Sequence, residues 1–266
     1  MKTSAASRSS GVAGAQTLLR ALDILDSFTE ERPSLTLADL GERAGLTAPT
    51  THRLVKALVS RGFVVADANR RYSLGPAVMR LASVVMQRTD DLVGLALPTL
   101  ERLREATGET ASLHCLIGAE RICVAELVSP EPIRMQSGVG RTYPAYAGAA
   151  GKALLAPQPG VLDRLGELAA VGPATSTDRA KLERELERIR QRGFAESESE
   201  VVRGAASFAV PVVANGAVLA AINVAGPATR WNRAKRAEAR DLVIAEVERL
   251  TAELAAASPT RAGVER

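Results

Sequence analysis

The sequence predicts an α+β protein made of an N-terminal winged helix-turn-helix, a linker helix and a C-terminal antiparallel sheet flanked by helices. Three observations support this prediction. Residues 35–74 read as two short helices around a glycine turn, followed by a short hairpin. Gly75-Pro76 then marks a domain boundary. From Glu109 onward, apolar residues alternate as they do in strands, between further stretches of helical spacing.

The helix-turn-helix is predicted from its local start and stop signals. Thr36 can cap the orphan N–H groups of a first helix, and Gly45 ends that helix where a left-handed residue is wanted. Thr47 caps a second helix, with Pro49 in its first turn, where a missing N–H costs little. The spacing therefore predicts two helices joined by a tight turn.

The second helix has one apolar and one polar face. The residues predicted to point inward are Thr50, Leu54, Ala57 and Leu58. The opposite face carries His52 and Lys56, with Pro49 and Arg53 at its edge. A polar, basic outward face is typical of a recognition helix. The alternative is a plain helical hairpin packed on a sheet, in which His52 and Lys56 are ordinary solvated residues.

A wing is predicted directly after this helix. Phe63-Val64-Val65 and Tyr72-Ser73-Leu74 read as short strands around the turn at Asp67-Ala68-Asn69, with Arg70 and Arg71 at the tip. A winged helix-turn-helix is a DNA-binding arrangement. The candidate DNA-contacting residues are Thr47, Pro49, Thr50, Thr51, His52, Arg53, Lys56, Arg70 and Arg71.

The distribution of charge agrees with a DNA partner. The chain has a formal net charge of +4, and residues 1–80 hold 11 of the 34 basic and 7 of the 30 acidic residues, which leaves 23 of each in the remainder. The whole basic excess therefore lies with the helix-turn-helix, as binding to the phosphates of double-stranded DNA requires.

Composition excludes several classes of protein. Among the 266 residues, 46% are hydrophobic and 3% aromatic, which predicts an aliphatic core. No apolar run approaches the ~18 residues needed to cross a bilayer, so we expect a cytoplasmic protein with no membrane partner. Two Cys and two His are not clustered at zinc-finger spacing, and no cofactor or metal is expected. Cys115 and Cys123 fall on adjacent predicted strands. They can be two separate buried thiols, or they can lie close enough to form a disulfide.

The predicted domains are a disordered tail over 1–14, the winged unit over 15–76, a linker helix over 77–90, the second domain over 91–257 and a tail over 258–266. In the winged unit, Leu18, Leu22, Leu25 and Phe28 predict a first amphipathic helix that supplies its core. In the linker, Val78, Leu81, Val85 and Met86 form an apolar row that can pack on the chain's own second domain or, as we expect, on a partner chain. Asp90-Asp91 begin another helix, which Pro98 is predicted to break, kink or restart.

The second domain is predicted from alternating and helical stretches. TASLHCLI, RICVAELV and IRMQSGV read as three strands, and GAAGKALLA (148–156) as a helix of small residues. Residues 162–169, 178–192 and 232–254 read as further helices, and SFAVPVV and AVLAAINVA as two strands around the hairpin turn Asn215-Gly216.

From about Ala15 to Leu254 the chain resembles the isocitrate lyase regulator (IclR) family of bacterial transcription factors. The stretch TLADLGERAGLTAPTTHRLVKALVSRGFV is similar to that family's winged helix, while IRMQSGVGRTYPAYAGAAGKALLA, GFAESESEVVRGAASFAVPV and AAINVAGPATR resemble its effector-domain signatures. The resemblance implies a GAF-like effector-binding domain, homodimers or dimers of dimers (a homotetramer), and DNA binding tuned by a small molecule. As a repressor or an activator, such a dimer is expected to read a pseudo-palindromic operator.

The resemblance also implies site residues. Thr50, His52 and Arg53 match the family's recognition helix, whereas Pro49 stands where Ser is common. Family members that bind small oxo-acids use a Gly-Ala pair, an Asp, a Cys and two Ser. The matching positions here are Ala149, Ala150, Ser197, Ser207, Asn223 and Ala225, with Tyr146 in place of a common His and Met135 as an apolar wall.

The expected ligand follows from these positions. The small residues after Gly148 leave N–H groups open at a helix start, which favours an anion. We therefore expect a small organic acid, held there by its carboxylate and neutral at its other end, and larger or more aromatic than a two-carbon oxo-acid. Lys152, one turn into this helix, can equally face solvent.

Two other functions remain open at this point. An enzyme would need an acid–base or nucleophilic pair, but His114 and Cys115 are strand neighbours that point to opposite faces. Glu196, Glu198 and Glu200 alternate on one predicted strand, as a solvated edge rather than a metal site. An architectural DNA-binding protein without a ligand is the other alternative, although the second domain is larger than a dimerisation handle requires.

Overall fold

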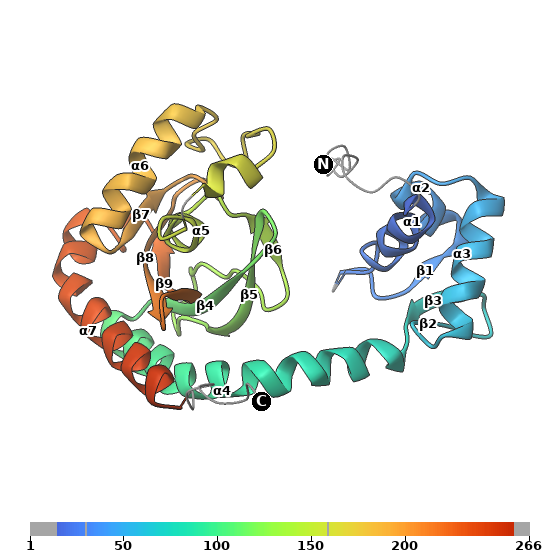
Figure 1. Cartoon of the computed structure of the whole chain (residues 1–266), viewed down its shortest axis with the longest axis horizontal. Helices are drawn as coiled ribbons and strands as arrows, with labels where there is room; N and C mark the ends of the chain where they lie inside the picture. Colours follow the sequence, from blue (N-terminus) through green and yellow to red (C-terminus); the bar gives the residue numbers. More distant parts are fainter. Residues whose placement is uncertain (1–14, 30, 159, 258–266) are drawn as a thin grey trace, which may run out of the picture. The chain divides into compact units, whose positions relative to one another are not determined.

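The computed structural model describes residues 15–29, 31–158 and 160–257, and the side chains of all of these except 85–91. The chain divides into two compact units, residues 1–88 and 89–266, and each is considered by itself (Figure 1). This division falls inside the predicted linker. The tails predicted over 1–14 and 258–266 lie outside the described residues.

The N-terminal unit is a winged helix-turn-helix. Its helices are α1 (Gln16–Leu25), α2 (Leu37–Ala44) and α3 (Ala48–Ser60), and its strands are β1 (Leu35–Thr36), β2 (Val64–Ala66) and β3 (Arg71–Leu74). The strands form one antiparallel sheet in the order β1-β3-β2 (Figure 1). The hairpin after α3 therefore forms as predicted, and the short strand β1 extends it.

Local signals explain where α2 begins and ends. Thr36 and Asp39 form a reciprocal capping box, in which the Asp39 N–H donates to the Thr36 hydroxyl (3.2 Å) and the Thr36 N–H donates to the Asp39 carboxylate (2.9 Å). The Thr36 hydroxyl also donates to the Asp39 carboxylate (2.7 Å), and the bond from the Thr36 N–H together with this one lowers the pKa of Asp39. Gly45 ends the helix at φ +64°, the left-handed conformation that glycine adopts without a steric cost.

The core of this unit corrects two predictions about which residues point inward. Its buried apolar side chains are Ile24, Leu35, Leu40, Leu54, Val55 and Val64. In α3, Thr51 and Val55 are buried in place of the predicted Thr50 and Ala57, while Leu54 is buried as predicted. In α1, Ile24 points inward, while Leu18 and Leu22 are 61% and 45% exposed.

Helix α4 (Pro76–Thr107) is one helix where two were predicted, the linker helix and a helix that begins at Asp90-Asp91, and it neither breaks nor restarts at Pro98. A proline inside a helix removes one backbone hydrogen bond. Three residues around Pro98, namely Ala96, Leu100 and Leu103, are fully buried in the core of the second unit. We attribute the continuity of α4 to this packing, since tertiary contacts routinely override local propensity.

The C-terminal unit is built on a six-stranded antiparallel sheet with the order β6-β5-β4-β9-β8-β7. Its elements after α4 are β4 (Thr110–Ile117), β5 (Glu120–Leu127), β6 (Thr142–Pro144), α5 (Ala149–Leu155), the 3-10 turn η1 (Val161–Arg164), α6 (Arg179–Arg192), β7 (Ala195–Glu198), β8 (Ala205–Ala214), β9 (Ala217–Pro227) and α7 (Arg233–Ala257). The end of α4 and α7 cover one face, and α5 and α6 cover the other (Figure 1). The predicted α+β class is confirmed.

Two predicted elements of this unit are absent from the described structure. IRMQSGV (133–139) is a loop, because the Glu126 carboxylate accepts hydrogen bonds from the N–H groups of Ser137 (2.6 Å) and Gly138 (3.2 Å), which a strand would use in its ladder. Residues 162–169 form only the turn η1, since the Arg179 guanidinium takes the carbonyls of Leu165 (2.8 Å) and Gly166 (3.3 Å). The hairpin turn Asn215-Gly216 forms as predicted, with both residues at positive φ.

Candidate DNA-binding surface and effector site

The outer face of α3 carries most of the predicted DNA-contacting side chains. Thr47, Pro49, His52, Arg53 and Lys56 are exposed, and Thr50 is half-buried. The Thr47 hydroxyl donates to that of Thr50 (3.1 Å). A helix with this face, placed in a major groove, presents donors to base edges and cations to phosphates.

Thr51 corrects the predicted DNA-contacting set. Its side chain is fully buried and donates to the backbone oxygen of Thr47 (3.0 Å). It lies at a close approach of α2 and α3, since a Cβ on Gly41 would be only 3.0 Å from the Thr51 hydroxyl oxygen. Thr51 therefore packs between the two helices and cannot reach DNA without leaving the core.

The two wing arginines differ in their freedom. Asp67 orders the turn by accepting from the N–H groups of Asn69 (2.9 Å) and Arg71 (2.8 Å). Arg70 sits at the tip in the left-handed region, with φ +58°, and is exposed. Arg71 lies in β3, and its guanidinium donates to the side chain (3.1 Å) and backbone oxygen (2.7 Å) of Ser34. Arg70 is thus the better placed of the two to meet a phosphate.

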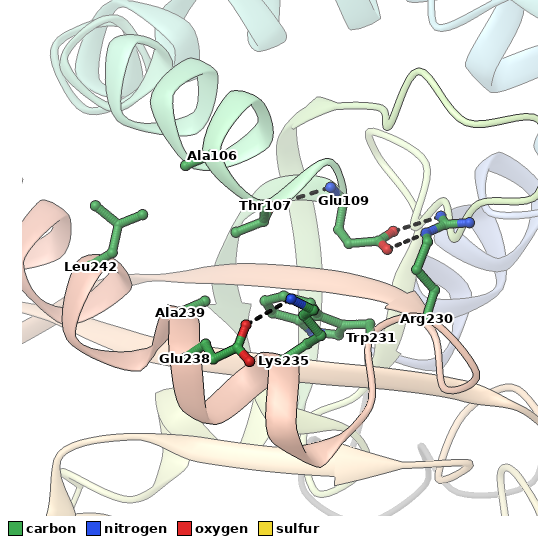
Figure 2. Close-up of a pocket in the computed structure, with 9 residues that line it drawn as sticks. All are labelled: Ala106, Thr107, Glu109, Arg230, Trp231, Lys235, Glu238, Ala239 and Leu242. Carbon is green, nitrogen blue, oxygen red and sulfur yellow. Dashed lines mark hydrogen bonds and ion pairs between the residues drawn. The ribbon is translucent and has the colours of Figure 1, made fainter.

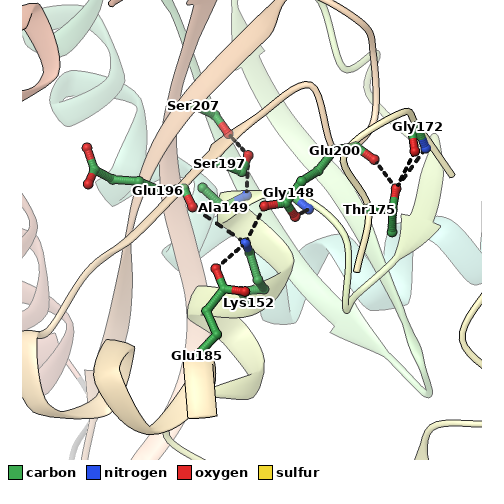
Figure 3. Close-up of polar contacts among 10 residues, drawn as sticks. All are labelled: Gly148, Ala149, Lys152, Gly172, Thr175, Glu185, Glu196, Ser197, Glu200 and Ser207. Carbon is green, nitrogen blue, oxygen red and sulfur yellow. Dashed lines mark hydrogen bonds and ion pairs between the residues drawn. The ribbon is translucent and has the colours of Figure 1, made fainter. Parts of the chain in front are cut away.

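In the second unit, most of the predicted effector-binding residues gather on the α5 side of the sheet. The Ser197 and Ser207 hydroxyls are 2.8 Å apart, and the Ala149 N–H donates to Ser197 (3.1 Å), as Figure 3 shows. Ser207 pairs across the strands with Ser197 on one side and Ala225 on the other. Asn223 lies two residues before Ala225 on β9, with its side chain on the same face.

The other predicted members are less directly placed. Ala150 is buried in α5 beside Ala149. Met135 is half-buried, and its backbone oxygen accepts from the Thr110 hydroxyl (2.6 Å). The Tyr146 hydroxyl both donates to (3.0 Å) and accepts from (3.1 Å) the backbone of Ala169. Tyr146 therefore anchors the segment around residue 169, and its contacts do not support a role in holding a ligand.

The start of α5 corrects the predicted anion site. Two of its N–H groups are already bonded, Gly148 to the Glu200 carboxylate (3.0 Å) and Ala149 to Ser197. Lys152 does not face solvent: it is 1% exposed, and its ammonium lies 2.6 Å from Glu185 and 2.5 Å from Glu200 (Figure 3). The protein's own carboxylate thus occupies the position predicted for a ligand.

These contacts also change the picture of the three alternating glutamates. Glu200 is a largely buried partner of Lys152 rather than part of a solvated edge. Glu196 and Glu198 lie 3.3 and 3.5 Å from the buried guanidinium of Arg236. The described residues contain no group of three or more His, Cys, Asp or Glu side chains that could hold a metal ion.

A buried polar chain on β4 and β5 was not predicted as part of the site. The His114 ring lies 3.0 Å from the Ser112 hydroxyl and 3.0 Å from the Arg121 guanidinium, and Ser112 accepts from the Asn223 amide (3.3 Å). Burial, and next to it the charge of Arg121, hold the pKa of His114 well below its usual value. The sequence does contain a signal for this hydrogen-bonded network: polar residues stand at inward-facing positions of strands that are otherwise apolar.

His114 and Cys115 do not form a catalytic pair. His114 is held by Ser112 and Arg121, while Cys115 packs with the core on the α7 side. Both cysteines are free thiols, and burial is the main cause that raises the pKa of Cys115 and raises that of Cys123 to about 12. Thiols held in this way are poor nucleophiles at neutral pH.

Two cavities lie elsewhere in the second unit. The first, of about 350 Å³, is bordered by the Glu109–Arg230 and Lys235–Glu238 ion pairs (Figure 2). The second, of about 810 Å³, lies between η1 and α6. Neither is lined by any of the predicted effector-binding residues. Within the described residues, no helix is both long and apolar enough to span a membrane.

Comparison with known proteins decides the family. A model described as "Bacterial transcriptional regulator IclR C-terminal" matches residues 84–252, and one described as "IclR helix-turn-helix domain" matches residues 17–68. The chain belongs to the IclR family. It is therefore a DNA-binding transcriptional regulator, and the resemblance in its sequence is confirmed.

Individual IclR-family relatives agree with this. The chain is 34% identical over 244 residues to the HTH-type transcriptional regulator BhcR of Paracoccus denitrificans, covering 90% of this chain and 87% of BhcR. An IclR regulator structure from Silicibacter superposes with a TM-score of 0.78 at 30% identity, covering 92% of this chain and 98% of that one. An IclR homologue from Microbacterium hydrocarbonoxydans, complexed with 4-hydroxybenzoate, superposes with a TM-score of 0.74 at 26% identity over 91% of this chain and all of that one. These relatives are transcriptional regulators or regulator homologues, not enzymes.

Proposed function

We propose that this IclR-family regulator binds a pseudo-palindromic operator as a homodimer or dimer of dimers, and that a small organic acid in the C-terminal unit modulates the binding. The exposed polar face of α3, with its hydrophobic side buried, is the observation that carries the DNA-binding part. Regulation of chromosomal genes would place the protein in the cytoplasm.

Operator reading is assigned to the side chains that α3 exposes. Arg53→Ala and His52→Ala should each weaken specific binding by about 1–3 kcal/mol if they reach base edges. Arg70→Ala should weaken binding to all sequences more evenly and flatten the salt dependence, as expected for a phosphate contact. A gel-shift titration with operator and with random DNA measures both effects. Arg188→Ala, on the exposed face of α6, is the matched control, and normal operator binding by both α3 variants would contradict the assignment.

Dimerisation is supported by an apolar surface on α4. Met79, Leu81 and Val84 are 75%, 48% and 56% exposed, while Val78 is half-buried. The side chains of Val85 and Met86, also predicted for this contact, lie outside the described residues. Large apolar side chains exposed along one helix are a feature of protein–protein contacts, so we assign this surface to a second copy of the chain.

Effector binding is supported by the neutral hydrogen-bonding groups on the α5 side of the sheet, and by the 4-hydroxybenzoate complex of the relative from Microbacterium hydrocarbonoxydans. An acid of that size, with an aromatic or extended neutral part, matches the ligand class that we expect. The ligand can change operator binding only if it has different affinities for two arrangements of the protein.

The test is operator affinity measured with and without organic acids, 4-hydroxybenzoate among them, each beside its neutral amide. At least one acid should change the affinity. Asn223→Leu should abolish that change and leave the affinity of the unliganded protein intact, because the winged unit is untouched. If operator binding is specific but no compound alters it, the protein is a ligand-independent architectural DNA-binding protein.

A further inference from the structure

The second unit contains a buried positive charge with no acidic partner. Arg121 on β5 is 6% exposed, and within the described residues none of its hydrogen bonds or ion pairs is to a carboxylate. Burial lowers the pKa of this guanidinium to about 10, so it stays charged at neutral pH. Buried charges are costly unless they are paired, and this position therefore needs an anion.

The partners of Arg121 use only one part of the guanidinium. Its Nη1 donates to Nδ1 of the neutral His114 ring (3.0 Å), which leaves the Nε2 hydrogen of that ring to point at Ser112 (3.0 Å). Ser112 in turn accepts from the Asn223 amide (3.3 Å). Each of these hydrogen-bonded residues fixes the orientation of the next, and together they hold the Arg121 guanidinium in one orientation.

The opposite edge of the guanidinium is unused. Nε is buried without a hydrogen-bond partner, and no described residue bonds Nη2. This edge is the one with which arginine binds a carboxylate through two parallel hydrogen bonds. The protein contains this two-point pairing with a carboxylate at Arg230, whose Nε and Nη2 lie 2.6 and 2.9 Å from the two oxygens of Glu109.

This edge lies beside the start of α5. Nη2 would be 3.5 Å from a Cβ on Gly148, which has φ +83° and which is the residue before α5. The guanidinium carbon lies 4.7 Å from the centre of the Tyr143 ring. At the other end of this hydrogen-bonded network, the Asn223 side-chain oxygen is also buried without a hydrogen-bond partner.

We propose that Arg121 is the residue that binds the carboxylate of the effector, and that Asn223 accepts a hydrogen bond from a hydroxyl or N–H group of the same ligand. This assignment rests on the proposed function of the second unit as an effector-binding domain. It places the anion-binding site at Arg121 on β5 instead of at the start of α5. One fixed, planar guanidinium suits a monocarboxylate, because a dianion would bring a second charge with no partner.

The test is direct binding to the full-length protein, by calorimetry and thermal shift. The probes are two pairs of acids that differ by one hydroxyl, propionate with lactate and benzoate with 3-hydroxybenzoate, each beside its own neutral amide. At least one acid should bind wild type at least 10-fold more tightly than its amide. Arg121→Gln should weaken the binding of that acid at least 30-fold. Arg121→Lys keeps the charge but lacks the edge that makes two hydrogen bonds, and it should weaken the binding about 10-fold. Arg188→Gln removes a charge from the surface of α6 and should change nothing.

The outcomes separate this site from the proposed function. If acids bind but Arg121→Gln binds them like wild type, Arg121 is not the carboxylate site, while effector binding itself stands. If amides bind as well as acids, or no acid binds wild type, the carboxylate subsite is wrong, and operator assays still decide whether another ligand acts. Should Arg121→Gln fail to fold by circular dichroism, Arg121→Lys decides the question alone. Asn223→Leu should remove any preference for the hydroxylated acid of each pair.

Discussion

Lys152 offers a quantitative test of how the second unit is held together. Its side chain is 1% exposed, and its ammonium contacts Glu185 at 2.6 Å and Glu200 at 2.5 Å. Lys152→Met keeps most of the length and the apolar character of the side-chain stem but removes the charge. Two carboxylates are then left facing each other without a cation, since Glu185 and Glu200 are only 23% and 14% exposed.

The magnitude follows from this burial. Removing one partner of a buried ion pair costs about 3–5 kcal/mol, and we take the lower end, about 3 kcal/mol, because both carboxylates retain some contact with water. For a unit of this size, each kcal/mol shifts the melting temperature by about 2–4 °C, so Lys152→Met should lower it by about 6–12 °C. Thermal unfolding followed by circular dichroism measures the shift.

Two further variants make the test specific. Lys235→Met removes an exposed lysine from its pair with Glu238, where both side chains are more than half exposed, and should change stability by less than about 0.5 kcal/mol. The triple variant Lys152→Met, Glu185→Gln, Glu200→Gln replaces the whole charged group and should recover most of the loss. Equal melting temperatures for Lys152→Met and Lys235→Met, or a triple variant no more stable than Lys152→Met, would contradict a stabilising role for this buried charged group.

Four other outcomes are expected. Thr51→Val should leave operator affinity unchanged in a gel shift and destabilise the winged unit by about 1 kcal/mol, since only an internal hydrogen bond is lost. Gly151→Ala should prevent folding or cost at least about 3 kcal/mol in a thermal melt, because its Cβ would overlap the carbonyl oxygen of Ala145. Leu81→Asp should dissociate the oligomer in light scattering, because it places a charge in the proposed contact. His114 has a folded-state pKa held below its unfolded value, so the unfolded chain binds more protons as pH falls below about 6.5. Wild type should therefore lose about 1 kcal/mol more stability than His114→Gln between pH 7 and 5.5 in chemical unfolding.

Local interactions are the part of the structure that the sequence alone determined. The capping box at Thr36, the left-handed Gly45 and the hairpin at Asn215-Gly216 each depend on residues within a few positions of one another. Their geometry is the same whatever the rest of the chain does. For this reason the winged helix, the exposed polar face of its second helix and the α+β class could be predicted, and with them the family and its role in DNA binding.

Helix rotation and continuity were beyond local signals. Successive residues of a helix are about 100° apart, so an error of one residue moves a side chain from the surface to the core. That is the difference between Thr50 and Thr51, and the packing of α2 at Gly41 decides it. Helix α4 likewise continues through Pro98, where its neighbouring residues pack into a core formed by strands that are distant in the sequence.

The effector region was decided almost wholly by tertiary structure. Lys152 meets Glu185 and Glu200, which lie 33 and 48 residues further along the chain, and this closes the helix start that seemed open to a ligand. Arg121 reaches His114 only because β4 and β5 pair in a register shifted by a bulge at Leu113/His114. The charge of a side chain is written in the sequence, but whether another residue neutralises it depends on which strands and helices fold against it.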